Sequence, residues 1–229
     1  MKSDAKSTIE TGKAILGIEL GSTRIKAVLI DQENKPIAQG NHTWENQLVD
    51  GLWTYSIEAI WSGLQDCYAD LRSNVKNLYG IEIENLAAIG VSAMMHGYMP
   101  FNAKEEILVP FRTWRNTNTG RAAAALSDLF VYNIPLRWSI SHLYQAILDN
   151  EAHVKDIDFL TTLAGYVHWQ LTGEKVLGIG DASGMLPIDP TTHNYSAEMV
   201  AKFDKLIAPN QYNWTLQDIL PKVLSAGES

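Results

Sequence analysis

Cysteine is almost missing from this sequence, since Cys67 is the one such residue among 229. A single thiol cannot form an internal disulfide and has no second cysteine with which to share a zinc site. This composition fits a reducing compartment. We expect Cys67 to be a small residue packed on a helix, as free cysteines commonly are.

Long apolar runs and basic clusters are missing as well. The apolar stretches are short and interrupted by polar residues, and residues 1–13 are too polar for a signal peptide. Lys and Arg number 18 against 26 Asp and Glu, which gives a formal charge of −8. Such a field attracts neither nucleic acid nor an anionic membrane, so neither is an expected partner. We predict a cytoplasmic protein.

A G-x-x-x-x-G-K-[ST] phosphate loop is also lacking, which excludes nucleotide binding of that type. What the chain does contain is 46% hydrophobic residues, enough to bury a substantial core as one large domain or two small ones. A folded globular protein is therefore predicted.

The first part of the chain alternates strand and helix patterns. Apolar runs separated by short polar turns predict an opening antiparallel meander. A helical spacing of apolar residues follows, with Ser56 placed to cap it and Glu58 in its first turn. The expected elements are strands in residues 14–20, 25–30 and 37–43, a helix over 57–71, a strand at 86–91, a loop at 92–97, and a hairpin of 98–101 with 107–110.

The second part is mainly helical. Helices are predicted over residues 119–132, 141–150 and 160–171, with polar or Pro-containing connections between them. Residues 216–224 form an amphipathic segment that has no evident packing partner of its own. We expect this stripe either to self-associate, as in a homodimer, or to be poorly ordered.

The stretch from Gly17 to Lys26 reads GIELGSTRIK, an acidic strand residue leading into a turn of small and hydroxyl residues. Such a turn offers backbone N–H groups and hydroxyls to phosphate oxygens, with the Glu19 carboxylate nearby to hold a hydrated Mg²⁺. A Gly-Ser hairpin turn also arises for purely structural reasons, and taken alone the motif favours that interpretation.

Four segments in order carry a resemblance to a known family. The opening turn resembles the phosphate loop of actin-like ATPases and FGGY carbohydrate kinases, with Glu19 in place of the usual Asp. Ile89 to Gly97 (IGVSAMMHG) is similar to the Gly-Ile-x-Gly-Gln-Met-His-Gly loop of xylulose kinases. The other two segments are RTWRN at 112–116, and Tyr166 through LTGE at 171–174 to DASG at 181–184. Together they cover most of residues 14–190.

The resemblance implies an α/β fold of the ribonuclease H-like, actin-like ATPase type, a mixed β-sheet flanked by helices with a helical insertion. Residues 1–13 are then a flexible polar leader, and 14–229 an amino-terminal sugar-binding domain. A missing carboxy-terminal domain would bind most of the nucleotide. The activity implied is transfer of the γ-phosphate of ATP, with Mg²⁺, to a hydroxyl of a ketose, a pentulose such as xylulose.

The family's general base lies in a Gly-Gly-x-Asp motif, which this sequence does not contain. The resemblance therefore places no catalytic residue in this chain, and we expect the isolated chain to be inactive. The alternative is a truncated sugar-binding or interaction module without phosphotransfer.

The resemblance also implies roles for particular residues. Phosphate would be bound at Gly21, Ser22, Thr23 and Lys26, with the metal held through water by Glu19. The sugar would meet Met95, His96, Trp114, Arg115 and Asn116. A neutral imidazole both donates and accepts hydrogen bonds, and an aromatic face packs well on sugar C–H groups. For Asp181 a structural role in a turn or cap is favoured. The remaining histidines lack metal-ligand spacing and are expected on the surface or in the core.

Overall fold

The computed structural model describes residues 2–228 of the chain. It divides the chain into two compact units, one made of residues 1–47 and 55–94 and the other of residues 48–54 and 95–229. Composition allowed either one large domain or two small ones, and the structure shows two units. Each is described on its own.

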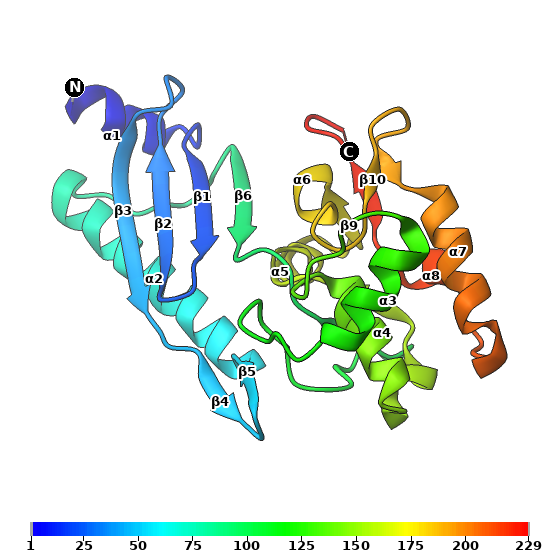
Figure 1. Ribbon diagram of the computed structural model, residues 1–229. Coiled ribbons are helices and arrows are strands. Elements are labelled where there is room, and N and C mark those ends of the chain that lie inside the picture. Colours follow the sequence, from blue (N-terminus) through cyan, green and yellow to red (C-terminus); the bar gives the residue numbers. More distant parts are fainter. Residues whose placement is uncertain (1, 229) are drawn as a thin grey trace. The chain divides into compact units, whose positions relative to one another are not determined.

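A four-stranded mixed sheet forms the centre of the first unit, in the order β3-β2-β1-β6 (Figure 1). The three opening strands are β1 (Ile15–Leu20), β2 (Arg24–Ile30) and β3 (Pro36–Thr43), and they pair antiparallel as predicted. Strand β6 (Ala88–Ala93) joins β1 in parallel. Alternation along β2 explains its placement, because Ile25, Ala27 and Leu29 are buried while Arg24 and Lys26 between them are exposed.

Helix α2 (Ile57–Tyr79) packs on β2 and β3, confirming and extending the predicted helix. Its start is fixed by the Ser56 hydroxyl, which accepts a hydrogen bond from the Ala59 N–H at 3.1 Å. It ends at Gly80, whose φ of 72° lies in the left-handed region that glycine tolerates. Cys67 is buried on this helix, as expected, and its thiol donates to the Ile25 carbonyl.

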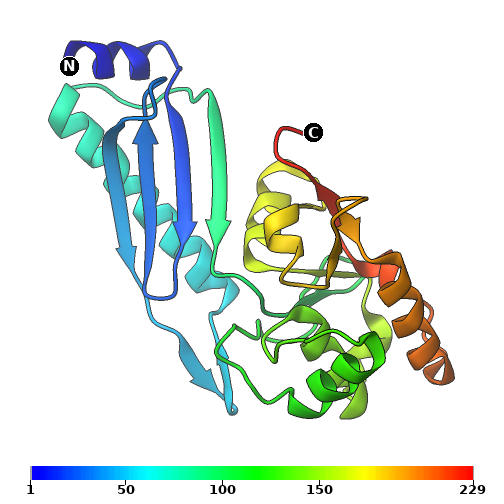
Figure 2. The ribbon, with the colours of Figure 1, turned by 45° about the horizontal axis from the view of Figure 1, so that its top comes forward.

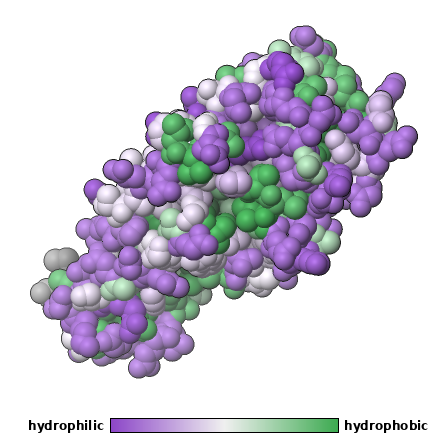
Figure 3. Space-filling view, turned by 90° about the horizontal axis from the view of Figure 1, so that it is seen from below, coloured by the Kyte–Doolittle hydropathy of each residue, from purple (hydrophilic) through white to green (hydrophobic). Residues whose placement is uncertain are grey.

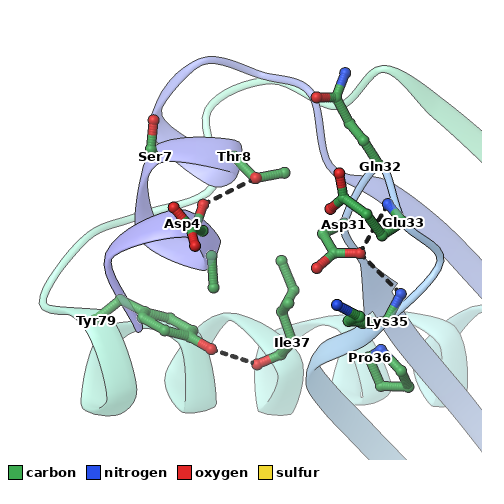
Figure 4. A pocket seen from close by; sticks show the side chains of 11 residues that line it. Asp4, Ser7, Thr8, Asp31, Gln32, Glu33, Lys35, Pro36, Ile37 and Tyr79 are labelled. Atoms are coloured by element: carbon green, nitrogen blue, oxygen red, sulfur yellow. Dashed lines mark hydrogen bonds between the residues drawn. The ribbon is translucent and has the colours of Figure 1, made fainter. Parts of the chain in front are cut away.

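The predicted flexible leader is wrong for most of its length, because residues Lys2–Glu10 form helix α1. Ala5 and Ile9, four residues apart and thus on one face, are buried. Figure 4 shows the residues on α1 that line a cavity of about 550 Å³ together with the β2–β3 turn and Tyr79. The polar composition of this segment did not indicate a helix, because the buried face of α1 consists of only these two residues.

The second unit is built mainly from helices, with short two-stranded pairs beside them (Figure 2). The longer helices are α3 (Gly120–Phe130), α4 (Ser139–Leu148), α5 (Leu163–Thr172) and α7 (Ala197–Ile207). The short ones are α6 (Ile179–Ala182), α8 (Leu216–Ile219) and the 3₁₀ turns Ala152–Asp156 and Ala208–Asn210. The strand pairs are β4 (Gln47–Val49) with β5 (Leu52–Thr54), β7 (Met99–Phe101) with β8 (Phe159–Thr161), β9 (Val176–Gly178) with β12 (Lys222–Leu224), and β10 (Ile188–Asp189) with β11 (Asn194–Tyr195).

The predicted hairpin of residues 98–101 with 107–110 is reduced to isolated bridges. Strand β7 instead pairs antiparallel with β8, which lies at the start of the segment predicted to be a helix over 160–171. The aromatic rings explain this pairing. Phe101 packs edge-on against Trp169 with ring centroids 5.2 Å apart, and Phe159 does the same at 5.4 Å. Packing between distant segments therefore decided the partner of β7.

Residues 216–224 are not an uncovered helical stripe, so the surface through which self-association was predicted is not exposed. Helix α8 is one turn long, and β12 follows it and pairs in parallel with β9. Leu216 and Ile219 are fully buried in the core of the second unit, and Leu220 is buried too. The reason given for a homodimer, or for disorder at this segment, is thereby removed.

The face of the molecule drawn in Figure 3 is largely hydrophilic, with hydrophobic residues in separate groups. No helix among the described residues is both long enough and apolar enough to cross a membrane.

Candidate functional site

In the first unit, the predicted phosphate turn joins β1 to β2 at Gly21–Thr23. The Gly21 N–H donates to the Arg24 carbonyl at 3.0 Å, which closes the turn. A Cβ atom at Gly21 would lie 3.0 Å from that same carbonyl oxygen, so the turn has room for little more than glycine. The two strands that flank it fix its position, because every residue of β1 is paired with one of β2.

Two stacked aromatic side chains hold the carbonyl groups of this turn. The Trp44 indole N–H donates to the Gly21 carbonyl at 2.7 Å, and the Tyr55 hydroxyl donates to the Ser22 carbonyl at 2.5 Å. The rings of Trp44 and Tyr55 are stacked with centroids 4.1 Å apart. Among the described residues, no hydrogen bond uses the backbone N–H of Ser22 or Thr23. The turn thus has its acceptors occupied and two donors available, which is the polarity that an anion requires.

Glu19 and Lys26 face each other across β1 and β2, with the Lys26 ammonium 3.5 Å from a Glu19 carboxylate oxygen. Both side chains are about half exposed, at 54% and 49%, so the pair is weak and either partner can turn to a ligand. A single exposed carboxylate fits Mg²⁺, which keeps several waters and takes one or two protein carboxylates. No group of three potential ligands for a metal lies together in the described part of the chain.

In the second unit, the loop carrying Met95 and His96 has an unusual backbone. His96 has a φ of 68° and Gly97 a φ of 97°, both in the left-handed region. Two hydrogen bonds with the 137–139 segment hold this conformation. The Gly97 N–H donates to the Arg137 carbonyl at 3.4 Å, and the Ser139 hydroxyl donates to the Gly97 carbonyl at 2.6 Å. The loop places Met95 on the surface with 46% of its area exposed.

The His96 ring has one nitrogen engaged. Its Nδ1 lies 3.3 Å from the carbonyl oxygen of Gly184, which can only accept, so Nδ1 carries the proton and Nε2 is an acceptor. Burial lowers the pKa of His96 below its ordinary value, outweighing the Gly184 carbonyl and the Asp181 carboxylate, which raise it. His96 is therefore a neutral imidazole at pH 7.

Asp181 is closer to the site than its predicted structural role suggested. It lies in the first turn of α6, where its backbone carbonyl accepts from the Gly184 N–H at 2.9 Å. Its carboxylate accepts from the Thr162 hydroxyl and is close enough to raise the pKa of His96. Burial raises the pKa of Asp181 itself. The residue orders the short helix that presents Gly184 to His96.

Trp114 is half-buried, and the guanidinium of Arg137 lies over its ring, 5.3 Å from the centroid. The charge of Arg137 also contributes to lowering the pKa of His96. The backbone links the two residues as well, because the Gly97 N–H donates to the Arg137 carbonyl. Sequence reasoning missed Arg137. It belongs to none of the motif segments, and one arginine in a connection before a helix gives no signal.

Arg115 and Asn116 both contact Trp53. The exposed Arg115 stacks its guanidinium on the Trp53 ring, 3.6 Å from the centroid. Asn116 is 4% exposed, its Oδ1 accepts from the Trp53 N–H at 2.9 Å, and its Nδ2 donates to the carbonyls of Trp53 and Thr113. The buried amide of Asn116 is therefore used within the protein, and its contact with a sugar stays a prediction.

A buried polar cluster lies beneath this region of the second unit. Arg112 forms a bidentate ion pair with Glu151, and the Tyr98 hydroxyl is 2.7 Å from Nε2 of His153. His142 is 1% exposed, and within the described residues neither of its ring nitrogens has a hydrogen-bond partner. Burial lowers the pKa of His142 to about 3 and that of His153 to about 4. Both lie in the core, which is one of the two places expected for them.

The mixed sheet of the first unit and the helical second unit define an α/β protein of the actin-like ATPase class. The model of the FGGY family of carbohydrate kinases, N-terminal domain, matches residues 14–229. The chain belongs to that family.

Similar proteins extend well beyond this chain. A xylulose kinase of Klebsiella pneumoniae is 20% identical over 197 residues, which are 82% of this chain and 40% of the relative. A xylulose kinase of Escherichia coli (strain K12) is 19% identical, with the same two shares. Among solved structures, a xylulose kinase and a gluconate kinase from Lactobacillus acidophilus superpose with TM-scores of 0.75 and 0.76 at 19% identity, each over 93% of this chain and 42% of the neighbour. The chain thus spans about 40% of its curated relatives.

Proposed function

We propose that this chain supplies the sugar-binding surface and one phosphate-binding turn of an ATP-dependent sugar kinase. The substrate would be a ketose, a pentulose of the xylulose type. The observation that carries the proposal is the placement of Arg137 in the second unit, where its guanidinium lies over Trp114 and its carbonyl holds the loop that carries His96. An acceptor, an aromatic face and exposed donors together suit a polyhydroxylated chain.

The roles at the sugar follow from the chemistry of each group. His96 Nε2 would accept a hydrogen bond from a ligand hydroxyl, because its Nδ1 is engaged with Gly184. Trp114 would pack on C–H groups, and the exposed thioether of Met95 would cover another apolar face of the ligand. Arg115, stacked on Trp53, would border the site from the side of β5.

At the turn of the first unit, the N–H groups of Ser22 and Thr23 and the hydroxyls beside them would bind phosphate oxygens of ATP. Lys26 would add a positive charge when its pairing with Glu19 opens. Glu19 would hold Mg²⁺ through a coordinated water. That ion, when bound, neutralises charge on the transferring phosphate.

Phosphotransfer also needs a base to accept the proton of the sugar hydroxyl. No Gly-Gly-x-Asp motif occurs in this sequence. We therefore propose that the base, the second phosphate loop and the adenosine site belong to a carboxy-terminal kinase domain. The 229 residues alone should bind sugar without phosphorylating it.

Binding of D-xylulose to the isolated chain, followed by calorimetry and by NMR of the indole N–H resonances, tests the proposal. We expect saturable binding and a shift of the Trp114 resonance. His96→Gln should weaken binding by up to about tenfold, the cost of one neutral hydrogen bond. The control His193→Gln alters an exposed histidine of the β10–β11 connection and should have no effect. A chain that binds no D-xylulose contradicts the proposal.

The same preparation tests the proposal that the base lies outside these residues. No sugar phosphate should form when Mg²⁺ and ATP are added to the isolated chain. Product that survives rigorous purification and is lost in Glu19→Ala would show that the base lies within these residues.

A further inference from the structure

Arg137 lies in a connection that no sequence motif marks, immediately before helix α4. We propose that it is a ligand-contacting, specificity-determining residue of the His96–Trp114 site, where its N–H groups bind an oxygen of the ligand. The inference rests on the proposed function, since it names a further member of the same sugar site.

The backbone first fixes where Arg137 can act. Its carbonyl accepts the Gly97 N–H, so Arg137 is attached to the residue that follows His96. Two residues later, Ser139 binds the Gly97 carbonyl and begins α4. The loop with His96 and the connection with Arg137 are therefore held together through the N–H and the carbonyl of Gly97. A ligand at His96 lies within reach of the long side chain of Arg137.

The side chain points in the same direction. Its guanidinium lies over the face of Trp114, 5.3 Å from the centroid, and it is close enough to His96 to contribute to the lowered pKa of that residue. An arginine held over an indole by a cation–π contact keeps its N–H groups available for hydrogen bonds, because the ring face attracts the positive charge and accepts none of the conventional hydrogen bonds. The contact thus orders the donors without consuming them.

The ion pairs of two other arginines in the second unit set Arg137 apart from them. Arg112 is buried and paired with Glu151, and Arg121 is paired with Asp149. Arg137 is exposed, and in the described part of the chain it forms no ion pair with a carboxylate. Its partner in the proposed complex is therefore a ligand oxygen rather than a protein one.

The three side chains together recognise a specific arrangement of ligand atoms. Nε2 of His96 accepts from a hydroxyl, Arg137 donates to a neighbouring oxygen, and Trp114 covers the C–H groups between them. The shared chemistry is a hydroxylated carbon chain with an oxygen acceptor beside a hydroxyl. That acceptor is either a neutral carbonyl or hydroxyl of a ketose or the carboxylate of an aldonate, and the two differ in how strongly they need the positive charge.

Two substitutions distinguish the role of the hydrogen-bond donors of Arg137 from the role of its positive charge. Arg137→Met removes the donors and the charge but keeps an apolar chain over Trp114. Arg137→Gln keeps an N–H donor without the charge. Arg121→Gln is the matched control, since it removes an exposed arginine that is already paired with Asp149. Each variant is titrated with D-xylulose and with D-gluconate, at low and at high salt, and its unfolding by urea is measured alongside.

If the oxygen is neutral, Arg137→Met should weaken D-xylulose binding by up to about tenfold, and Arg137→Gln should restore most of it. If it is a carboxylate, both variants should weaken D-gluconate binding by roughly ten- to a hundredfold, and salt should weaken the wild type as well. Either result supports the inference, and urea unfolding should be unchanged because Arg137 is exposed.

The inference is overturned, while the proposed function stands, if the wild type binds either sugar, His96→Gln weakens that binding, and both Arg137 variants bind like wild type. If the wild type binds neither sugar, the proposed function fails and the inference falls with it. Equal losses in Arg137→Met and in the control Arg121→Gln would also overturn it, because they would show a general effect of charge.

Discussion

The carbonyl oxygen of Gly184 lies 3.3 Å from Nδ1 of His96, and a Cβ atom added to Gly184 would lie 2.6 Å from that same nitrogen. The Gly184 carbonyl accepts a hydrogen bond from the Nδ1–H group and so fixes the tautomer of the imidazole. The missing side chain of Gly184 leaves the space that the ring occupies. Both depend on α6 and on the left-handed loop at His96 staying in place.

Gly184→Ala should displace the His96 ring and weaken sugar binding without unfolding the protein. No left-handed φ is required at Gly184, so the backbone tolerates alanine and the clash falls on the imidazole. We expect at least the roughly tenfold loss predicted for His96→Gln, since the acceptor is misplaced rather than merely removed. The check is the affinity for D-xylulose, together with the ¹⁵N shifts that report which His96 nitrogen carries the proton.

Gly180→Ala provides the control for this substitution. It lies on helix α6, which Gly184 follows, and a Cβ atom there would meet nothing within 4 Å. Binding and tautomer should be those of the wild type. If Gly184→Ala also binds like the wild type with Nδ1 still protonated, the contact between Gly184 and His96 does not control the site.

Asn116→Ala should lower the free energy of unfolding, and it should affect sugar binding only as a consequence. The substitution leaves the partly buried N–H of Trp53 without its acceptor, whereas the carbonyls of Trp53 and Thr113 keep hydrogen bonds from backbone N–H groups. A buried polar group left unsatisfied costs about 1–3 kcal/mol, so we expect a loss of about 1–3 kcal/mol in the free energy of unfolding. Urea unfolding followed by circular dichroism measures it, with the exposed neighbour Asn118→Ala as control. Unchanged stability with lost sugar binding would support the ligand role that the sequence predicted.

Acid should destabilise the protein through His142 and His153. Their folded-state pKa values, about 3 and about 4, lie below the ordinary value of 6.5. The unfolded chain therefore takes up protons that the folded chain refuses as the pH falls below 6.5. Stability is fully present above that pH and is lost toward pH 4, at up to about 2.7 kcal/mol per pH unit for two protons.

His142→Leu isolates the contribution of one residue. The side chain is buried, and within the described residues its nitrogens have no partners, so leucine costs no hydrogen bond there. The slope of stability against pH between 4 and 6 should fall by up to about 1.4 kcal/mol per pH unit relative to wild type. Carboxylates such as Asp181 titrate equally in both proteins and cancel in the comparison. Parallel pH profiles for the two proteins would mean that His142 is protonated in the folded state.

Elements with strong local patterns were predictable from the sequence. The strands β1, β2 and β3 alternate clearly, and α2 carries a long apolar stripe with Ser56 as its cap. Elements decided by distant partners were not. Strand β8 forms because Phe159 meets Trp169 and Phe101, and the segment from Leu216 divides into a helical turn and a strand because β9 offers it an edge.

The candidate site shows the same division. His96 and Trp114 were found because their neighbours form motifs. Asn116 belongs to one of those motifs, yet its direction is set by the distant Trp53, which sequence spacing does not reveal. Arg137 enters the site only through the fold, by its contact with Gly97 and the position of its guanidinium over Trp114. Sequence identified the loops, and packing decided which side chains face a ligand.

Helix α1 gives the sharpest test of a corrected prediction, because a flexible leader and a packed helix respond oppositely to the loss of one side chain. Ile9 is 2% exposed, so Ile9→Ala should leave a cavity that costs about 2–5 kcal/mol of the first unit's stability. Ser7→Ala, an exposed position on the same helix, should change stability by less than about 0.5 kcal/mol. Urea unfolding combined with hydrogen exchange of the α1 amides measures both effects. Exchange at the rate of free peptide throughout residues 2–10, with Ile9→Ala as stable as wild type, would show that the leader is flexible after all.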